Sequence, residues 1–326
     1  MKAIIYEEYG LPEVLTYKEV ATPTPAADEV LVKVHATSIN ISDWYSMLGK
    51  PFLVRLAFGL RKPNYPFIGG DVAGVVEGVG DAVTQFKVGD AVFGDLSAGK
   101  RGSFAEYVAV PETALVLKPD NISFEQAAAI PLAGVTALQG IRAVGNLQAG
   151  QSVLINGASG GVGTLILQLA KRTHADITAV CSTRNIEMVQ SLSADHIIDY
   201  TQENVTQGDK RYDVIIAVNG YHPLWDYRRI LKDGGTYLCI GGTMPQIFQS
   251  MLLGGIVSLG TDKKFKAMGT AKSNQDDLKT LQNLLQANEL TPVIDKRFPL
   301  ARTADAMRYY GEVGAQGKIV ITVNNS

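Results

Sequence analysis

The sequence predicts an α/β protein built from two parts, and three observations support this prediction. The length of 326 residues corresponds to roughly two domains of ordinary size. The first third consists of short runs of β-branched residues separated by Pro and Gly, which is typical of a compact β barrel or sandwich. From residue 152 onward, short apolar runs alternate with helical patterns, which indicates βαβ units and a doubly wound parallel sheet.

We expect β-strands in the first third wherever a β-branched run lies between turn residues. These runs cover residues 3–6, 14–19, 29–35, 71–80, 88–93, 104–110 and 114–117. Between them, segment 48–66 mixes apolar and basic side chains. Two interpretations remain open for this segment, an amphipathic surface helix and a lid over a pocket.

The pattern changes at Ser123, which forms a capping box with Gln126 and predicts the start of a helix. Pro131 interrupts this helix before a second one over 134–144. The alternating region then predicts strands over 152–156, 177–181, 196–199, 212–218, 235–240 and 256–259. Helices are expected over 162–174, 185–192 and 223–231, and the tail adds helices over 274–288 and 303–310 and a strand over 318–323.

Composition excludes several classes of protein. The 30 Lys and Arg residues nearly balance the 32 Asp and Glu residues, which argues against binding to a nucleic-acid backbone. The two cysteines are too few for a disulfide framework or a Cys-rich zinc site. Glu7 and Glu8 stand where a signal peptide would be apolar, and the longest apolar stretch, 247–259, is shorter than the ~20 residues of a spanning helix. We therefore expect a soluble cytoplasmic protein with no membrane partner.

Glycine is in excess, with 33 residues, and one cluster carries a functional pattern. The predicted strand 152–156 runs directly into Gly-Ala-Ser-Gly-Gly-Val-Gly at 157–163, and a helix follows. The spacing matches the dinucleotide-binding fingerprint, with Ala158 in the first glycine position. Such a turn brings backbone N–H groups and a helix N-terminus against a pyrophosphate. The residues expected at the cofactor are Ser159, Gly160, Gly161 and Val162; the alternative is a turn that serves packing only.

The end of the second strand of the βαβ region indicates which cofactor is bound. NAD-binding folds usually place a carboxylate there for the ribose 2′-hydroxyl. This chain instead has Ser182, Thr183 and Arg184, whose hydroxyls and guanidinium suit a 2′-phosphate and favour NADPH. Alternatively, Arg184 is a solvated residue at a helix start. Three further strand ends supply candidate cofactor contacts, namely Tyr200, Asn219 and the pair Gly241 and Gly242.

Several stretches of the chain, in order, resemble the medium-chain dehydrogenase/reductase superfamily, and most of all its zinc-free, quinone oxidoreductase-like branch. Besides the glycine turn, these stretches are 36–43 (ATSINISD), 68–76 (IGGDVAGVV), 88–93 (VGDAVF), 129–137 (AIPLAGVTA), 150–154 (GQSVL) and 317–320 (GKIV). The resemblance implies a GroES-like catalytic domain formed by residues 1–125 and 267–326. It also implies a Rossmann NADP-binding domain, residues 126–266, inserted between these two segments.

The chain departs from the zinc enzymes of this superfamily where their metal ligands lie. It has Asn40 in place of a ligand Cys, and Gly70-Asp71 in place of a His-Glu pair. A catalytic zinc needs three protein ligands, so we expect no metal. Without a Lewis acid, the hydride acceptor must already be electrophilic, as a quinone or an α,β-unsaturated carbonyl compound is.

The resemblance also implies roles for individual residues. Asn40 would lie near the nicotinamide and donate a hydrogen bond to a substrate carbonyl, and Tyr45 would donate a proton. Thr136 and Lys318 would contact the cofactor. The alternatives are purely structural roles, namely a turn-forming Asn, a packing Tyr and a solvated Lys. By the same analogy, 252–257 would form a homodimer interface; the alternative is a core strand that forms a wall of the pocket.

We therefore expect a zinc-independent, NADPH-dependent oxidoreductase that reduces a small electrophilic molecule. Two alternatives remain open. One is a metal-free NADP-dependent oxidoreductase of alcohols and aldehydes. The other is a non-catalytic, NADPH-binding sensor protein.

Overall fold

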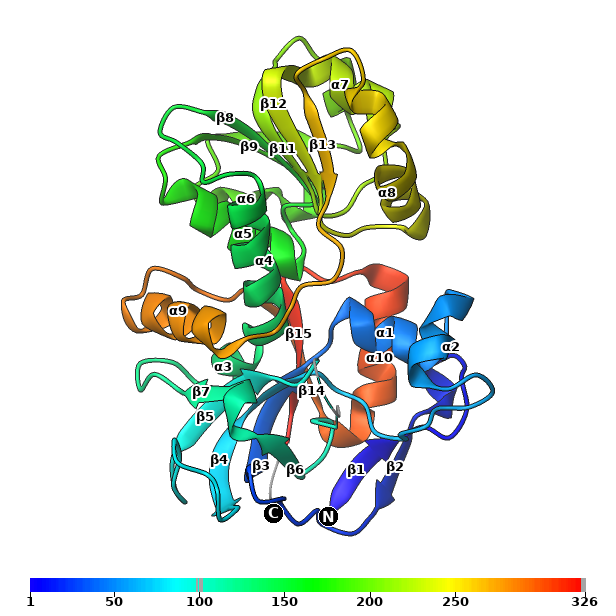
Figure 1. The fold of residues 1–326 in the computed structure, drawn as a ribbon, viewed down its shortest axis with the longest axis vertical. Coiled ribbons are helices and arrows are strands. Elements are labelled where there is room, and N and C mark those ends of the chain that lie inside the picture. Colours follow the sequence, from blue (N-terminus) through cyan, green and yellow to red (C-terminus); the bar gives the residue numbers. More distant parts are fainter. Residues whose placement is uncertain (98, 100–101, 324–326) are drawn as a thin grey trace. The chain divides into compact units, whose positions relative to one another are not determined.

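The computed structural model describes residues 1–97, 99 and 102–323, and the chain folds as two compact units (Figure 1). One unit, here called the discontinuous unit, consists of Met1–Val135 and Lys272–Ser326. The other, the inserted unit, is Thr136–Ala271. The inserted unit begins later than the expected residue 126, because helix α3 (Phe124–Ala128) packs on strands of the discontinuous unit.

The discontinuous unit is built on a seven-stranded sheet and a separate two-stranded sheet. The larger sheet has the order β14-β15-β3-β4-β5-β7, and β6 also pairs with β3. Figure 1 shows β15, from the end of the chain, among strands from its beginning. The strands are β1 (Lys2–Ile5), β2 (Thr16–Glu19), β3 (Glu29–Ser38), β4 (Asp71–Val79), β5 (Ala91–Asp95), β6 (Tyr107–Pro111), β7 (Leu115–Leu117), β14 (Ile294–Pro299) and β15 (Lys318–Thr322).

Strand β3 shows why this sheet forms. Its valines at 30, 32 and 34 are fully buried and alternate with less buried residues, the period of a strand with one face on the core. β3 pairs antiparallel with β4, β6 and β15, so segments far apart in the sequence share one core. The close pairing needs glycine at residue 74, where a Cβ atom would lie 2.1 Å from the Lys33 carbonyl oxygen.

Helices cover this sheet, and one of them lies in the segment for which the sequence allowed two interpretations. Segment 48–66 contains the short helix α2, whose Phe52 and Leu56 side chains are exposed. A helix is therefore present, whereas its action as a lid stays a prediction. The helices of this unit are α1 (Ile41–Leu48), α2 (Phe52–Phe58), α3, the start of α4 (Pro131–Ala143), α9 (Gln275–Gln286) and α10 (Thr303–Val313), with 3-10 turns η1 (Pro12–Val14), η2 (Glu112–Ala114) and η5 (Leu300–Arg302).

The inserted unit is a doubly wound, six-stranded sheet in which every neighbouring pair is parallel. Its order is β10-β9-β8-β11-β12-β13, with α5 and α6 on one face and α7 and α8 on the other (Figure 1). The strands are β8 (Ser152–Asn156), β9 (Asp176–Cys181), β10 (His196–Asp199), β11 (Tyr212–Ala217), β12 (Leu231–Cys239) and β13 (Lys264–Ala267). The helices are α5 (Gly161–Lys171), α6 (Ile186–Ser191), α7 (Leu224–Ile230) and α8 (Met244–Ser258), with 3-10 turns η3 (Thr183–Asn185) and η4 (Val205–Gln207).

The strand predicted over 256–259 is wrong. These residues end helix α8, and the last strand of the sheet is β13. A short apolar run does not distinguish a buried strand from a helix, and here the helix buries Gly254 and Val257. A Cβ atom at Gly254 would lie 3.2 Å from the Phe265 carbonyl oxygen, so helix and strand pack closely. Within the described ranges, no helix has both the length and the apolar character needed to cross a membrane.

Candidate functional site

The glycine turn of the inserted unit joins β8 to α5, as the sequence predicts. Gly157 has φ +87°, which favours glycine, and a Cβ atom at Gly163 would lie 2.1 Å from the Gly157 carbonyl oxygen. These two glycines therefore allow the strand and the helix to approach each other. Gly160 differs, because its nearest atom to a Cβ would be the Gly157 oxygen at 3.8 Å. The space beside Gly160 is thus available to a ligand.

The N-terminus of α5 can hold a phosphate. Gly160 is its N-cap residue, and among the described residues the helix has neither a side-chain cap nor an acidic group in its first turn. The first N–H groups of a helix have no partner within it, and they carry the positive end of the helix dipole. This end of α5 therefore fits a pyrophosphate bound at Ser159, Gly160, Gly161 and Val162.

The end of β9 carries the residues expected at a 2′-phosphate. Ser182 and Thr183 follow the strand, and Arg184 lies exposed within η3. The sequence analysis missed the carboxylate of Asp199, which ends the neighbouring strand β10. The Thr183 hydroxyl donates to Asp199 at 2.5 Å, and this bond holds the pKa of Asp199 below its usual value. A negative charge thus stands next to the hydroxyl that is expected to contact the cofactor.

A second missed residue, Asn185, connects the glycine turn with the end of β9. Its buried side-chain amide donates to the Ser159 hydroxyl at 2.9 Å and to the Ser182 hydroxyl at 3.2 Å. One amide therefore fixes the glycine turn against the end of β9. The signal available in the sequence was an Asn at a helix start, which is a common capping position and points to no ligand.

The remaining strand ends of the inserted unit meet at the same edge, because all six strands are parallel. Tyr200 is 60% exposed, and its backbone N–H donates to the Cys181 carbonyl oxygen at 3.0 Å. The backbone N–H of Asn219 donates to Asn156 at the end of β8. Gly241 and Gly242 follow β12, while Thr136 lies half-buried on α4. The cofactor contacts of all these residues stay predictions.

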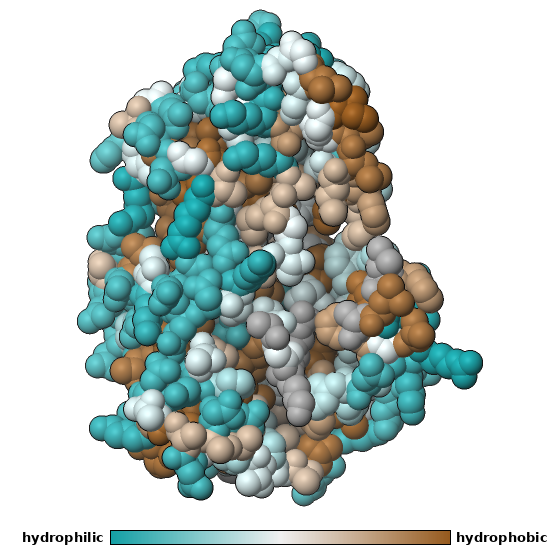
Figure 2. All heavy atoms as spheres, viewed as in Figure 1, coloured by the Kyte–Doolittle hydropathy of each residue, from teal (hydrophilic) through white to brown (hydrophobic). Residues whose placement is uncertain are grey.

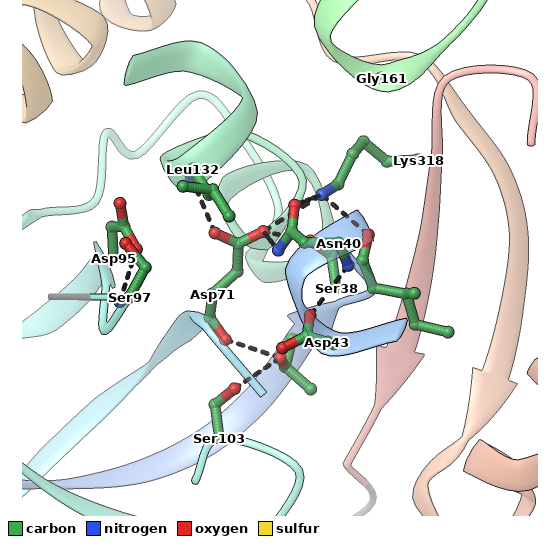
Figure 3. A network of polar contacts seen from close by, with 12 residues as sticks. Ser38, Asn40, Asp43, Asp71, Asp95, Ser97, Ser103, Leu132, Gly161 and Lys318 are labelled. Carbon is green, nitrogen blue, oxygen red and sulfur yellow. Dashed lines mark hydrogen bonds and ion pairs between the residues drawn. The ribbon is translucent and has the colours of Figure 1, made fainter. Parts of the chain in front are cut away.

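The discontinuous unit contains a buried polar cluster around Asp71, which we call the Asp71 cluster (Figure 3). Asp71 begins β4, and its side chain is fully buried. Its Oδ2 atom accepts hydrogen bonds from the Ser38 hydroxyl at 2.5 Å and from the Asn40 amide at 2.8 Å. Its Oδ1 atom accepts from the Leu132 backbone N–H at 2.9 Å. The carboxylate is therefore held from both sides.

Lys318 supplies the positive charge of this cluster. It begins β15, and its ammonium lies 3.2 Å from Asp71 Oδ2. It also donates to the Ile39 carbonyl oxygen at 3.0 Å and to Asn40 Oδ1 at 2.5 Å. These three contacts equal the three donors of an ammonium group. Lys318 thus points into its own unit, and a direct cofactor contact stays a prediction.

Asn40 and Tyr45 lie on helix α1 or at its start. Asn40 is 7% exposed, and its backbone N–H is capped by the Asp43 carboxylate at 2.9 Å. Tyr45 is half-buried, and this burial raises its pKa above the ordinary value. Its phenol therefore carries its proton at neutral pH. The structure brings Asn40, Asp71 and Lys318 into contact, but tests neither the catalytic role of Asn40 nor that of Tyr45.

The positions at which related enzymes hold zinc do not fit a metal here. Asn40 offers an amide that is already bonded to Lys318 and Asp71, and Gly70 has no ligand atom in its side chain. Within the described part of the chain, no group of three or more His, Cys, Asp or Glu side chains is arranged to hold a metal ion.

Comparisons with known proteins agree with the fold. Residues 26–120 match the family model described as an alcohol dehydrogenase GroES-like domain, and residues 192–321 match that of a zinc-binding dehydrogenase. An NADPH-dependent alkenal/one oxidoreductase of Arabidopsis thaliana is 36% identical over 98% of this chain and 79% of its own length. A chloroplast envelope quinone oxidoreductase homolog of the same plant is 33% identical over 98% of both chains. The solved quinone oxidoreductase from Coxiella burnetii superposes with a TM-score of 0.88 at 27% identity, covering 99% of each chain.

Proposed function

Since the chain belongs to the medium-chain dehydrogenase/reductase superfamily, we propose that it is a zinc-independent oxidoreductase that uses NADPH to reduce an activated acceptor, either a quinone or an α,β-unsaturated carbonyl compound. The observation that carries this proposal is the uncapped N-terminus of α5 at the glycine turn, on the carboxyl edge of a parallel sheet. The relatives named as alkenal/one and quinone oxidoreductases support the class of acceptor.

Bound NADPH would supply the hydride. The chain's own residues would hold it by the backbone N–H groups of 160–162 at the pyrophosphate and by Ser182 and Arg184 at the 2′-phosphate. Arg184 makes charge-assisted bonds that suit a phosphate. Asp199 opposes this assignment, because its charge next to Thr183 would repel a phosphate. The relative named as NADPH-dependent supports NADPH, and the Arg184 variant tests which residue contacts its 2′-phosphate.

Activation of the acceptor would come from hydrogen bonds. Asn40 Nδ2 has two N–H groups, and Asp71 takes one of them. The other would donate to the substrate carbonyl oxygen, where negative charge develops after hydride addition. Tyr45 holds a proton on its phenol that could neutralise the product. Such acceptors delocalise the developing charge, so no Lewis acid is needed.

The test is oxidation of NADPH and of NADH with 1,4-benzoquinone, 9,10-phenanthrenequinone, an alkenal and crotonyl-CoA as acceptors. We expect turnover with at least one acceptor, a preference for NADPH, and no loss of rate after metal removal with a chelator. Arg184→Ala should raise the KM for NADPH far more than that for NADH, with Arg211→Ala as a matched exposed control. Equal rates with both cofactors would refute the Arg184 assignment. NADPH binding without any turnover would favour the sensor protein.

We also propose that the chain forms a homodimer through α8. Met251, Leu252 and Ile256 on this helix are each more than half exposed, and Figure 2 shows apolar side chains gathered over it. Exposed apolar patches of this kind usually mark an interface. Leu252→Glu should convert a dimer into a monomer in light scattering, and a native monomer would refute the proposal. A cytoplasmic location likewise stays a proposal, which cell fractionation tests.

A further inference from the structure

The Asn40 amide is bonded at both of its ends to buried charges. Its Oδ1 atom accepts from the Lys318 ammonium at 2.5 Å, and its Nδ2 atom donates to Asp71 at 2.8 Å (Figure 3). Both charged side chains are almost completely buried, at 6% and 0% exposure. Burying two charges is costly and adds little net stability, so such a pair commonly serves to fix one conformation.

The two partners determine which way the amide faces. An ammonium group can only donate and an ionised carboxylate can only accept. A flipped amide would place its NH₂ group against Lys318 and its oxygen against Asp71, which would replace two favourable contacts by two repulsive ones. The observed orientation is therefore the only one that this pair permits, and it leaves the second Nδ2 N–H of Asn40 as the group not used by the cluster.

The partners are themselves held in place by neutral groups. Asp71 accepts from Ser38 and from the Leu132 backbone, and Lys318 donates to the Ile39 carbonyl oxygen. Ser38 and Ile39 belong to the segment that leads into Asn40. The charges can therefore shift little without breaking their contacts with the two residues that precede Asn40.

We infer that Asp71 and Lys318 are positioning residues that lock the Asn40 amide in one orientation, so that its free N–H is always presented as a donor. This inference rests on the proposed function, in which that N–H contacts the carbonyl oxygen of the acceptor. The pair contacts Asn40, and we assign its effect on the reaction to this contact.

The first test compares Lys318→Met, Asn40→Ala and the double variant. Lys318→Met should lower kcat roughly tenfold with little change in KM, because binding survives while the donor is misoriented. In the Asn40→Ala background, Lys318→Met should have no further effect, and Lys318→Arg should retain most of the activity. An equal loss in both backgrounds would overturn the inference, as would full activity of Asn40→Ala.

The second test does not depend on turnover. In protein labelled with ¹⁵N-asparagine, the Asn40 side-chain amide signals are identified by their loss in Asn40→Ala. We expect these signals to shift or broaden in Lys318→Met. Unchanged signals would overturn the inference that the pair fixes the orientation of the amide. If the native protein reduces no acceptor, the proposed function fails, and this spectrum still decides whether the lock exists.

Two variants guard against a general loss of structure. Ser38→Ala removes only one neutral donor to Asp71, so it should fold and show a smaller shift of the same amide signals. Thr303→Val removes a buried hydroxyl bond to Leu300 in the same unit, and it should lower stability without moving the Asn40 signals. If Thr303→Val moves them as much as Lys318→Met does, the inference is overturned.

Discussion

The two units use polar groups in opposite ways. In the Asp71 cluster the charged atoms are buried and bonded to one another, and Lys318 has a partner for each of its donors. At the strand ends of the inserted unit, Arg184 and Tyr200 are exposed and the N-terminus of α5 has no side-chain cap. One unit thus fixes the orientation of a few buried groups, whereas the other places polar groups at an exposed edge.

The largest effect should come from breaking the buried pair. Asp71→Ala leaves the Lys318 ammonium buried without its counter-charge, so we expect a loss of roughly 3–5 kcal/mol in the free energy of unfolding, measured by urea denaturation. The exposed Lys2–Glu19 pair is the control. Glu19→Ala should leave the denaturation midpoint almost unchanged, because solvent screens that pair. Similar losses in the two variants would mean that burial does not distinguish these two ion pairs.

A second experiment separates packing from ligand binding within one turn. Gly163→Ala places a Cβ atom 2.1 Å from the Gly157 carbonyl oxygen and should cost about 3 kcal/mol in the free energy of unfolding. Gly160→Ala meets nothing closer than 3.8 Å, so its stability loss should stay below about 1 kcal/mol. Its Kd for NADPH should nevertheless rise at least roughly tenfold by calorimetry, since the new methyl group would occupy the ligand's space. Unchanged affinity in Gly160→Ala would contradict the assignment of this turn.

A third experiment uses pH to test a buried carboxylate beside the Asp71 cluster. Asp95, opposite Asp71 on β5, is buried, and its Oδ2 atom has no hydrogen-bond partner among the residues that the structure describes. Burial together with the charge of Asp71 raises the pKa of Asp95. The folded state therefore binds this proton more tightly than the unfolded chain, whose Asp pKa is about 3.9. The stability that Asp95 contributes is fully present below the unfolded pKa of about 3.9, and it is lost as the pH rises through the pKa of Asp95 in the folded state.

Asp95→Asn removes this titration. It should raise the free energy of unfolding at pH 7.5 by about 1 kcal/mol, and the gain should vanish near pH 3.5. The exposed Asp209→Asn should show no such difference between the two pH values. A gain in Asp95→Asn that is equal at both pH values would show that the effect is not electrostatic.

An effect no larger than that at Asp95 is expected at Tyr227. Its buried hydroxyl accepts from the Asn156 amide at 2.6 Å, between the ends of β8 and β11. Tyr227→Phe should cost about 1 kcal/mol in the free energy of unfolding, because Asn156 Nδ2 keeps its contact with the Gly220 carbonyl oxygen. The exposed Tyr17→Phe should cost nothing measurable. A loss above about 3 kcal/mol would mean that the polar groups at this edge have no alternative hydrogen-bond partners, as in the Asp71 cluster.

Local features were predictable from the sequence, whereas partners distant along the chain were not. Strand β8 and the turn into α5 follow from an apolar run and glycines within 20 residues, so their bounds were nearly right. Asp71 and Lys318 are separated by 247 positions, and nothing at either position indicates the other. The contact of Asp199 with Thr183 could not be predicted for a related reason, since it exists only because β10 pairs with β9.

Helix α8 illustrates the other limit of prediction. Its residues 256–259 form a short apolar run that suits either a strand or a helix, and the packing of Gly254 against β13 decides for the helix. In β13, charged and apolar residues alternate as expected for a strand. This edge strand has only four residues, which is too short for the alternation to be recognised in the sequence.

The discontinuous unit also constrains the order of events on the ribosome. β15 pairs with β3 in its sheet, yet the whole of the inserted unit is translated between them. When Asp71 leaves the exit tunnel, the ammonium that neutralises it has not been made. The nascent N-terminal segment must therefore keep this carboxylate hydrated until residue 318 emerges, and its β-sheet closes only after the whole inserted unit has been translated.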